Sequence, residues 1–293
     1  MTSSQTQYAF FGSPKFAALI LGGLISHGYL PKVVVCNPDR PVGRKKIITP
    51  PPVKSLILNH GAWNTPAIKT IQPEKLDSGF KIRDSGFKID LFIVAAYAKI
   101  IPKAILEIPR LGTIGVHPSL LPKYRGASPI QSALLAGEEK TGVTLYLMDE
   151  KMDHGPVLAQ AEIAIDPNDN YGSLEEKLGN LGAKLLIESL PKIKSGQIKP
   201  QDQNHAQASF TKKFKTEDGF INEKDLLKAT SGDKTLANAI LGKVRALSHE
   251  PGTWTIQNGK RTKILEAEMN VGKLVIKKIQ TDGRKPRDMN HIT

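Results

Sequence analysis

Cysteine is nearly absent from the 293-residue chain, and so are long apolar runs. The single cysteine, Cys36, excludes a disulfide within the chain and suits a reducing compartment. Its place at the end of VVVC predicts a buried strand residue rather than a reactive thiol. The longest apolar run, AALILGGLI, is far shorter than the ~20 residues that cross a bilayer. The polar start, MTSSQTQ, does not resemble a secretory signal. We therefore expect a cytoplasmic protein without membrane contact.

Common metal and dinucleotide motifs are also missing. The sequence has no CxxC, HExxH or Walker pattern, so we expect no metal site. The first predicted strand-to-helix turn, GSPKF from Gly12, lacks the second and third glycines of GxGxxG. Those glycines let a pyrophosphate approach the backbone, so NAD binding is disfavoured.

Acidic residues are scarce relative to basic ones. The chain has 41 Lys and Arg against 28 Asp and Glu, a net charge of +13. From Gln207 to the end there are 17 basic and 10 acidic residues, which makes this part the more basic per residue. A polyanionic partner is the functional interpretation, and a solvated basic surface is the alternative. A second cluster of cations suits phosphate contacts. It lies between Asn37 and Pro52 and comprises Arg40, Arg44, Lys45 and Lys46.

Strands and helices alternate through the first two thirds of the sequence. This order predicts an α/β fold with a doubly wound, mostly parallel sheet. The Pro-rich segment from Asn37 to Pro52 is expected to be irregular. The expected strands are 8–12, 32–36, 90–95, 112–117, 141–148 and 157–165, and the expected helices are 15–27, 53–60, 102–108, 128–136 and 173–195.

The last third has a different pattern. A helix is expected at 234–247, and alternating strands at 253–257, 262–269 and 273–279 predict a smaller β-barrel of OB type. We expect domains at 1–194 and 209–293, joined by a polar linker at 195–208. The near-repeat DSGFKIR/DSGFKID within 77–90 is interpreted as a local duplication that lengthens a loop or hairpin.

A histidine and an acidic residue mark the most informative region. His117 follows a predicted strand, and Asp153 lies in the turn DHG. Imidazole transfers protons near neutral pH, and a carboxylate partner fixes its tautomer. Sites gather at the carboxyl ends of parallel strands, so we expect these side chains to meet. The Pro-containing loop from Ser119 to Pro129 suits the positioning of a ligand. A purely structural histidine is the alternative.

The same residues resemble the methionyl-tRNA formyltransferase family, and the similarity runs nearly end to end. HPSLLPKYRGASPIQ at His117 together with DHG is specific for folate-dependent formyltransferases. The segments VRALSHEPGTW at Val244 and KILEAEM at Lys263 narrow the resemblance to the tRNA enzymes. Further matching segments are FFGSPKFA, PDRPVGRKK, AAYAKIIPKAIL, KTGVT and MDEKMDHGPVL.

The resemblance implies formyl transfer from 10-formyltetrahydrofolate to the α-amine of methionine on initiator tRNA. We also expect a monomer. The family's catalytic His and Asp map onto His117 and Asp153, and its Asn maps onto Gly115. The basic cluster from Arg40 to Lys46 would contact tRNA. The folate is expected at two groups of residues, Ala95, Ala96 and Tyr97, and Ser119, Leu120, Leu121 and Pro122.

Gly115 is the departure from the family's pattern. Loss of one hydrogen-bond donor to a developing oxyanion costs about 2.7–4 kcal/mol. A backbone N–H, a water or a polar group from elsewhere would have to fill the space. Two alternatives follow, a formyltransferase for a small amine such as an amino sugar nucleotide or a purine precursor, and a non-catalytic tRNA- or folate-binding protein.

Overall fold

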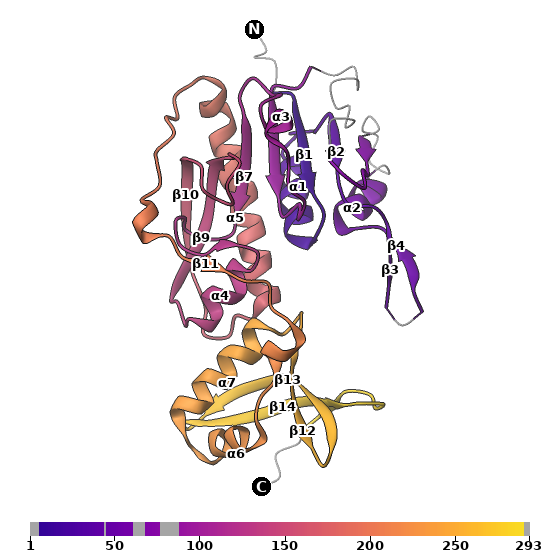
Figure 1. The fold of residues 1–293 in the computed structure, drawn as a ribbon, viewed down its shortest axis with the longest axis vertical. Coiled ribbons are helices and arrows are strands. Elements are labelled where there is room, and N and C mark those ends of the chain that lie inside the picture. The colour runs from indigo at the N-terminus through magenta and orange to yellow at the C-terminus, as the bar shows by residue number, and fades with distance from the viewer. Residues whose placement is uncertain (1–5, 44, 61–67, 77–87, 290–293) are drawn as a thin grey trace. The chain divides into compact units, whose positions relative to one another are not determined.

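A seven-stranded sheet forms the main layer of the first part of the chain (Figure 1). The computed structural model describes residues 6–43, 45–60, 68–76 and 88–289. Strands β1, β2, β5, β6 and β7 run parallel, and β9 is antiparallel to β7. The mostly parallel α/β sheet is therefore confirmed. In spatial order the strands are β10 (Val157–Ala164), β9 (Lys140–Leu147), β7 (Thr113–His117), β6 (Leu91–Ala95), β1 (Tyr8–Gly12), β2 (Val33–Val35) and β5 (Lys69–Ile71).

Helices cover both faces of this sheet. The residues of β1, β2, β6 and β7 are all buried, as expected for strands packed on both sides. Helices α1 (Lys15–Ser26) and α5 (Tyr171–Lys194) lie on one face. A Cβ on Gly182 of α5 would lie 3.3 Å from Val116 of β7 and 3.4 Å from Ile20 of α1. The short helix α3 (Lys103–Leu106) packs on the opposite face, against Phe92 and Val94.

A hairpin, rather than an irregular loop, follows β2. Strands β3 (Arg40–Val42) and β4 (Ile47–Thr49) pair antiparallel, so the expectation of no regular structure at 37–52 was wrong. A two-stranded ribbon leaves outward-facing N–H positions unpaired, and it therefore accommodates Pro41. Gly43 takes a positive φ of 70° at the turn. Helix α2 (Pro52–His60) begins directly after the hairpin.

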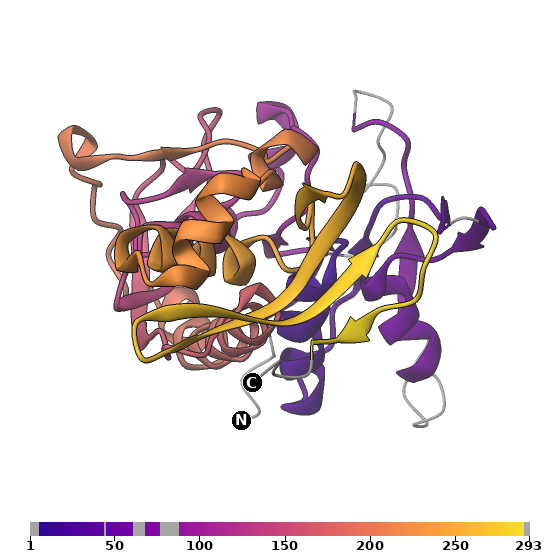
Figure 2. The same cartoon turned by 90° about the horizontal axis from the view of Figure 1, so that it is seen from below.

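The C-terminal part is a four-stranded antiparallel sheet packed against two helices. Its strands follow the order β12 (Thr253–Gln257), β13 (Lys260–Asn270), β14 (Lys273–Thr281) and β15 (Arg287–Asp288). Figure 2 shows the long β13–β14 ribbon. Within the described residues β12 and β15 do not pair, so the row is not closed into the expected barrel. Helices α6 (Glu223–Ser231) and α7 (Lys234–Ala246) pack on the sheet through Ala229, Ile240 and Val244.

Helix α6 was not expected from the sequence, and Asn222 caps it by accepting a hydrogen bond from Lys224 N. The remaining elements are helix α4 (Pro129–Leu135), the paired strands β8 (Arg125–Gly126) and β11 (Phe210–Thr211), and the 3₁₀ turns at His205–Gln207 and Thr216–Gly219.

Contacts divide the chain into two discontinuous units. The first is Met1–Arg125, Gly142–Ile163 and Glu176–Ser209, and the second is Gly126–Thr141, Ala164–Glu175 and Phe210–Thr293. The boundaries 1–194, 195–208 and 209–293 stay a prediction about domains. The DSGFKI duplication falls almost wholly on residues outside the described part.

Candidate active site

The carboxyl ends of β6 and β7 bring the main predicted residues to one edge of the sheet. Val94 pairs with Gly115, so Ala95 and His117 follow on neighbouring parallel strands. On the other side of β7, Gly115 pairs with Tyr146 and His117 pairs with Thr144 of β9. Opposed residues of an antiparallel pair share a face, so these four side-chain positions lie on one face of the sheet.

The ring of His117 is fixed by a backbone carbonyl. Its Nε2 lies 2.9 Å from the carbonyl oxygen of Tyr124. A carbonyl only accepts hydrogen bonds, so Nε2 carries the proton in the neutral ring and Nδ1 carries the lone pair. Nδ1 lies 3.6 Å from Oδ2 of Asp153. The predicted pair is therefore brought together, with Nδ1 as the atom that can take up a proton.

Asp153 is held by two residues that the sequence did not single out. Tyr146 donates a hydrogen bond from Oη to Oδ1 of Asp153, at 2.7 Å. The amide of Gln203 donates to the backbone carbonyls of Asp153 and Gly155, at 3.0 and 2.7 Å. Asp153 itself takes a φ of 50°, which favours glycine and asparagine over most residues. The turn is thus locked in an unusual backbone conformation by side chains from elsewhere in the chain.

The loop after His117 is tied to β9 by Thr144. The Thr144 hydroxyl donates to the carbonyl of Ser119 at 2.6 Å and accepts from the N–H of Leu121 at 3.0 Å. Gln160 donates to the carbonyl of Leu121 at 2.8 Å. The Ser119 hydroxyl donates to the carbonyl of Lys123 at 2.6 Å. These bonds give the loop a fixed shape beside His117.

The predicted folate residues differ in how far they are exposed at this edge. Ala96 is exposed and takes a φ of 45°, directly after β6. Leu120 and Pro122 are half-buried. Tyr97 points into the core, where its ring meets Phe11 edge to face at 5.6 Å. Burial and the nearby Cys36 raise the pKa of Tyr97 to about 12. The Tyr97 side chain therefore packs beneath the edge. Ala95, Ser119 and Leu121 are buried as well.

A network of polar side chains backs the Asp153 turn. Arg125 is buried and donates to Oε1 of Gln203 at 2.6 Å and to Nδ1 of His205 at 2.9 Å. His205 stacks on His154 with ring centroids 4.2 Å apart, and His154 bonds Asp149 at 2.7 Å. Burial, followed by the neighbouring His154 and Arg125, lowers the pKa of His205.

Gln203 and His205 both come from the segment that we expected to be a linker. Its polar, aperiodic sequence gave no sign of this role. Gln201 also exchanges backbone hydrogen bonds with Val157, at 2.7 and 2.8 Å. The segment is therefore bound along the first unit rather than free of it.

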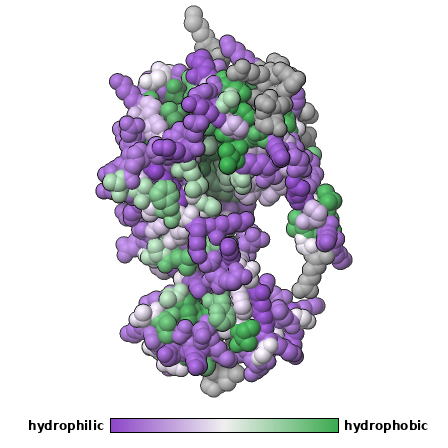
Figure 3. Space-filling view, in the orientation of Figure 1, coloured by the Kyte–Doolittle hydropathy of each residue, from purple (hydrophilic) through white to green (hydrophobic). Residues whose placement is uncertain are grey.

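The predicted phosphate-binding cations lie on the β3–β4 hairpin. Lys45 and Lys46 are exposed, Arg40 forms an exposed ion pair with Glu74 at 2.6 Å, and Arg44 lies outside the described residues. Exposed aliphatic side chains share the hairpin (Figure 3). They are Val42, Ile47 and Ile48.

The root of the hairpin is anchored by a network of hydrogen bonds. Lys54 lies 2.8 Å from Oδ2 of Asp39 and donates to Gln72 at 2.8 Å. Gln72 in turn donates to Asp39 at 2.8 Å and to the carbonyl of Asn37 at 2.7 Å. Hydrogen bonds from Lys54 and Gln72 lower the pKa of Asp39.

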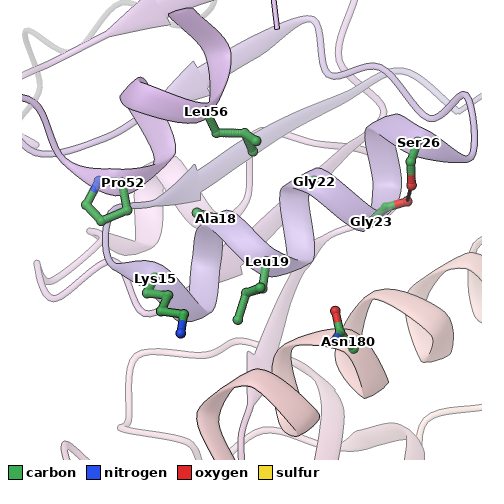
Figure 4. A pocket seen from close by; sticks show the side chains of 9 residues that line it. All are labelled: Lys15, Ala18, Leu19, Gly22, Gly23, Ser26, Pro52, Leu56 and Asn180. Atoms are coloured by element: carbon green, nitrogen blue, oxygen red, sulfur yellow. Dashed lines mark hydrogen bonds between the residues drawn. The ribbon is translucent and has the colours of Figure 1, made fainter. Parts of the chain in front are cut away.

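A hollow of about 500 Å³ lies along α1 (Figure 4). Its floor includes Ala18, Gly22 and Gly23, and Leu56 and Asn180 form its sides. Gly23 lets α1 approach α5 closely, because a Cβ there would lie 2.5 Å from that of Ala183. None of the predicted site residues lines this hollow.

Two kinds of feature are absent from the described residues. No group of three or more His, Cys, Asp or Glu side chains there is arranged to hold a metal ion. Within the same ranges, no helix combines the length and the apolar character needed to cross a membrane.

Similarity to known proteins identifies the family. The family described as "Formyl transferase" matches residues 7–190. A methionyl-tRNA formyltransferase of Chloroflexus aggregans is 41% identical over 260 residues, which cover 88% of this chain and 79% of the relative. The chain belongs to the methionyl-tRNA formyltransferase family. The corresponding protein of Bacillus subtilis is 40% identical over 88% of this chain and 77% of its own length.

Solved structures of other formyltransferases share the fold. A methionyl-tRNA formyltransferase from Clostridium thermocellum matches 94% of this chain and 99% of its own, with a TM-score of 0.61 at 16% identity. A 4-N formyltransferase from Francisella tularensis matches 91% of this chain and 99% of its own, with a TM-score of 0.64 at 16% identity. The methionyl-tRNA formyltransferase fold thus holds His117 and Asp153 at the edge described above.

Proposed function

We propose that this chain transfers the formyl group of 10-formyltetrahydrofolate to the α-amine of methionine on initiator tRNA. The observation that carries the proposal is the meeting of His117 and Asp153 beside a tied loop, in a chain of the methionyl-tRNA formyltransferase family. The Clostridium thermocellum protein that shares the fold is named a methionyl-tRNA formyltransferase. Another solved structure with a similar fold is HypX in complex with tetrahydrofolic acid.

His117 and Asp153 supply the proton chemistry. Attack of an amine on a formyl carbon releases a proton and places negative charge on the formyl oxygen. The lone pair on Nδ1 of His117 accepts that proton, while Nε2 stays bonded to the Tyr124 carbonyl. The resulting imidazolium then presents an N–H from Nδ1 toward Oδ2 of Asp153, which stabilises its charge. The protonated ring is the group that returns a proton to the leaving nitrogen.

The folate donor supplies the activated formyl group when it is bound. Two features of the sheet edge support the binding of a flat ring. Ala96 is small and exposed, and Leu120 and Pro122 present half-buried apolar side chains. We assign donor binding to both predicted groups. They are Ala95, Ala96 and Tyr97, whose side chain supports the edge from below, and Ser119, Leu120, Leu121 and Pro122.

The hairpin is the proposed contact for the tRNA. Lys45 and Lys46 are exposed and carry charge suited to phosphates, and Arg40 and Arg44 belong to the same basic cluster. Exposed Val42, Ile47 and Ile48 add apolar surface that can pack against bases or sugars. We also propose that the protein acts as a monomer in the cytoplasm.

Formylation of methionine-charged initiator tRNA with 10-formyltetrahydrofolate tests the proposal. We expect turnover, and we expect tRNA to compete effectively against amino sugar nucleotides and purine precursors. Preference for a small amine would instead favour the first alternative. Salt-sensitive tRNA binding without formyl transfer would favour the non-catalytic alternative.

Asp153→Ala is the variant that tests the role of the carboxylate. It should abolish transfer and leave tRNA binding nearly intact, because the hairpin cations are untouched. Undiminished turnover by this variant would refute the role of Asp153.

A further inference from the structure

The space that a side chain at position 115 would take is filled by Tyr146. Gly115 and Tyr146 are directly opposed on β7 and β9. A Cβ built on Gly115 would overlap Cε1 and Cζ of the Tyr146 ring and lie 2.7 Å from its Oη. The backbone of Gly115 does not take a positive φ, so conformation does not demand glycine there. Glycine is needed because the phenol end of Tyr146 passes over it.

The phenol brings a hydrogen-bond donor to that space. In an asparagine, the amide nitrogen lies about 2.4 Å from its own Cβ by standard bond lengths. The Tyr146 hydroxyl lies 2.7 Å from the Cβ position of residue 115. The hydroxyl is thus about as far from that position as an amide carried by residue 115 would be. Burial, and then the charge of Asp153, raise the pKa of Tyr146 well above its ordinary value, which keeps the phenol protonated.

The hydroxyl acts on one oxygen of the carboxylate and leaves the other for the histidine. Tyr146 donates to Oδ1 of Asp153, whereas Oδ2 faces Nδ1 of His117. The Asp153 side chain is 15% exposed and that of His117 is 7% exposed, so little water competes for these positions. The carboxylate cannot rotate without losing the bond to the buried phenol.

We propose that Tyr146 is a positioning residue of the formyl-transfer site, and that it takes the place left by the missing side chain of Gly115. Through Oδ1 it orients Asp153 so that Oδ2 receives the imidazolium of His117. This inference rests on the proposed function. It adds that positions 115 and 146 work as a pair, so that neither can be changed alone without loss.

Tyr146→Phe is the first test, because it keeps the ring over Gly115 and removes only the hydroxyl. We expect kcat on charged initiator tRNA to fall about 10- to 100-fold, as for loss of a hydrogen bond to a charged group. The KM for tRNA should change little. The acid limb of the pH–rate profile should move to higher pH. The hydrogen bond from Tyr146 favours the charged form of the Asp153 carboxylate, and this variant lacks that bond.

Tyr8→Phe is the matched control. Tyr8 is equally buried in the same sheet and donates its hydroxyl to the carbonyl of Tyr29 at 2.7 Å. Loss of the Tyr8 hydroxyl should lower the melting temperature about as much as loss of the Tyr146 hydroxyl does. It should leave the pH–rate profile unchanged. Equal profiles for wild type and Tyr146→Phe would overturn the proposal, and so would equal changes in both variants.

A swap of the pair provides the second test. Gly115→Asn alone should lower kcat at least 10-fold, because the new side chain collides with the ring and displaces the phenol. Gly115→Asn combined with Tyr146→Ala has room for the amide and should turn over faster than Tyr146→Ala with Gly115 retained. Gly115→Ala with Tyr146→Ala adds bulk without an amide and should show no such recovery.

The swap would overturn the proposal if Gly115→Asn kept full activity, or if the alanine pair recovered as much as the asparagine pair. Melting curves and tRNA binding establish that each variant is folded. Inactive wild type would count against the proposed function, whereas an active wild type with an unaffected Tyr146→Phe would count against the role of Tyr146 alone.

Discussion

Two regions of the first unit carry the proposed function, and they differ in exposure. All five residues of β7 are buried, and His117 at its end is fixed by a carbonyl on one nitrogen and faced by a carboxylate on the other. All six residues of β3 and β4 are exposed. Proton transfer needs fixed geometry in a site with little water. Contact with a polyanion needs charge that reaches outward. Changes to the buried region should therefore affect kcat, and changes to the hairpin should affect KM.

The largest effect is expected from His117→Ala. General acid–base catalysis contributes about 10²- to 10⁴-fold, so kcat should fall by that order. The affinity for tRNA, measured by filter binding, should stay within about twofold, because the hairpin is unchanged. His27→Ala serves as the control, since His27 is exposed at the end of α1 and should keep normal turnover. A large loss of affinity in His117→Ala would contradict the division between the two regions.

A smaller loss of kcat is expected from Gln203→Ala. This amide holds the carbonyls of Asp153 and Gly155, and its removal frees the turn that carries the carboxylate. We expect about a 10-fold decrease in kcat, comparable to the loss of one to two net hydrogen bonds. Gln197→Ala removes an exposed glutamine from the same segment and is the control. If both variants behaved alike, the segment would be only a connector.

The hairpin should respond in KM and in salt dependence. We expect Lys45→Ala with Lys46→Ala to raise the KM for tRNA several-fold at moderate salt. The slope of log affinity against log salt should become shallower by about 0.7–0.9 for each lost phosphate contact. Lys32→Ala removes an exposed cation at the opposite end of β2 and should leave the slope unchanged. An unaltered slope in the double variant would place the tRNA contact elsewhere.

The smallest effect concerns the root of the hairpin and its response to acid. Because the folded-state pKa of Asp39 is lowered, its contribution to stability is present above the unfolded pKa, about 3.9. That contribution is lost as the pH falls through the lower, folded value. Hydrogen exchange at Asn37 and Asp39, which follow β2, should therefore quicken in acid relative to exchange within β2 itself. Asp39→Asn should show fast exchange at neutral pH already, with little further change in acid.

The sequence predicted the sheet well because each strand and helix has its own strong local pattern. The apolar run DLFIVAA and the strand before His117 correspond to β6 and β7, and the pairing of their ends follows from parallel topology. The meeting of His117 and Asp153 could thus be predicted from the sequence alone. The hairpin was missed because prolines hid a pairing that needs only two exposed strands.

The other partners in the site could not be predicted because they depend on long-range contacts. Tyr146 lies in an apolar strand, where a buried aromatic residue needs no special explanation. Only the register of β7 against β9 shows that it covers Gly115. Gln203 and His205 lie in a polar segment whose sequence has no periodicity, and their role depends on bonds across about fifty and eighty positions of the chain, to Asp153 and Arg125.

The fit of Tyr146 over Gly115 constrains how a chain of this kind can diverge from its relatives. A side chain cannot be gained at position 115 while the aromatic residue stays at 146, so the order of mutations matters: the ring has to shrink first. A lineage that changes from one arrangement to the other by single substitutions passes through an intermediate with a cavity between positions 115 and 146. In that intermediate neither residue supplies a hydrogen-bond donor. A survey that scores family members by position 115 alone would therefore count this chain among the inactive ones, whereas a survey that scores the two positions jointly would not.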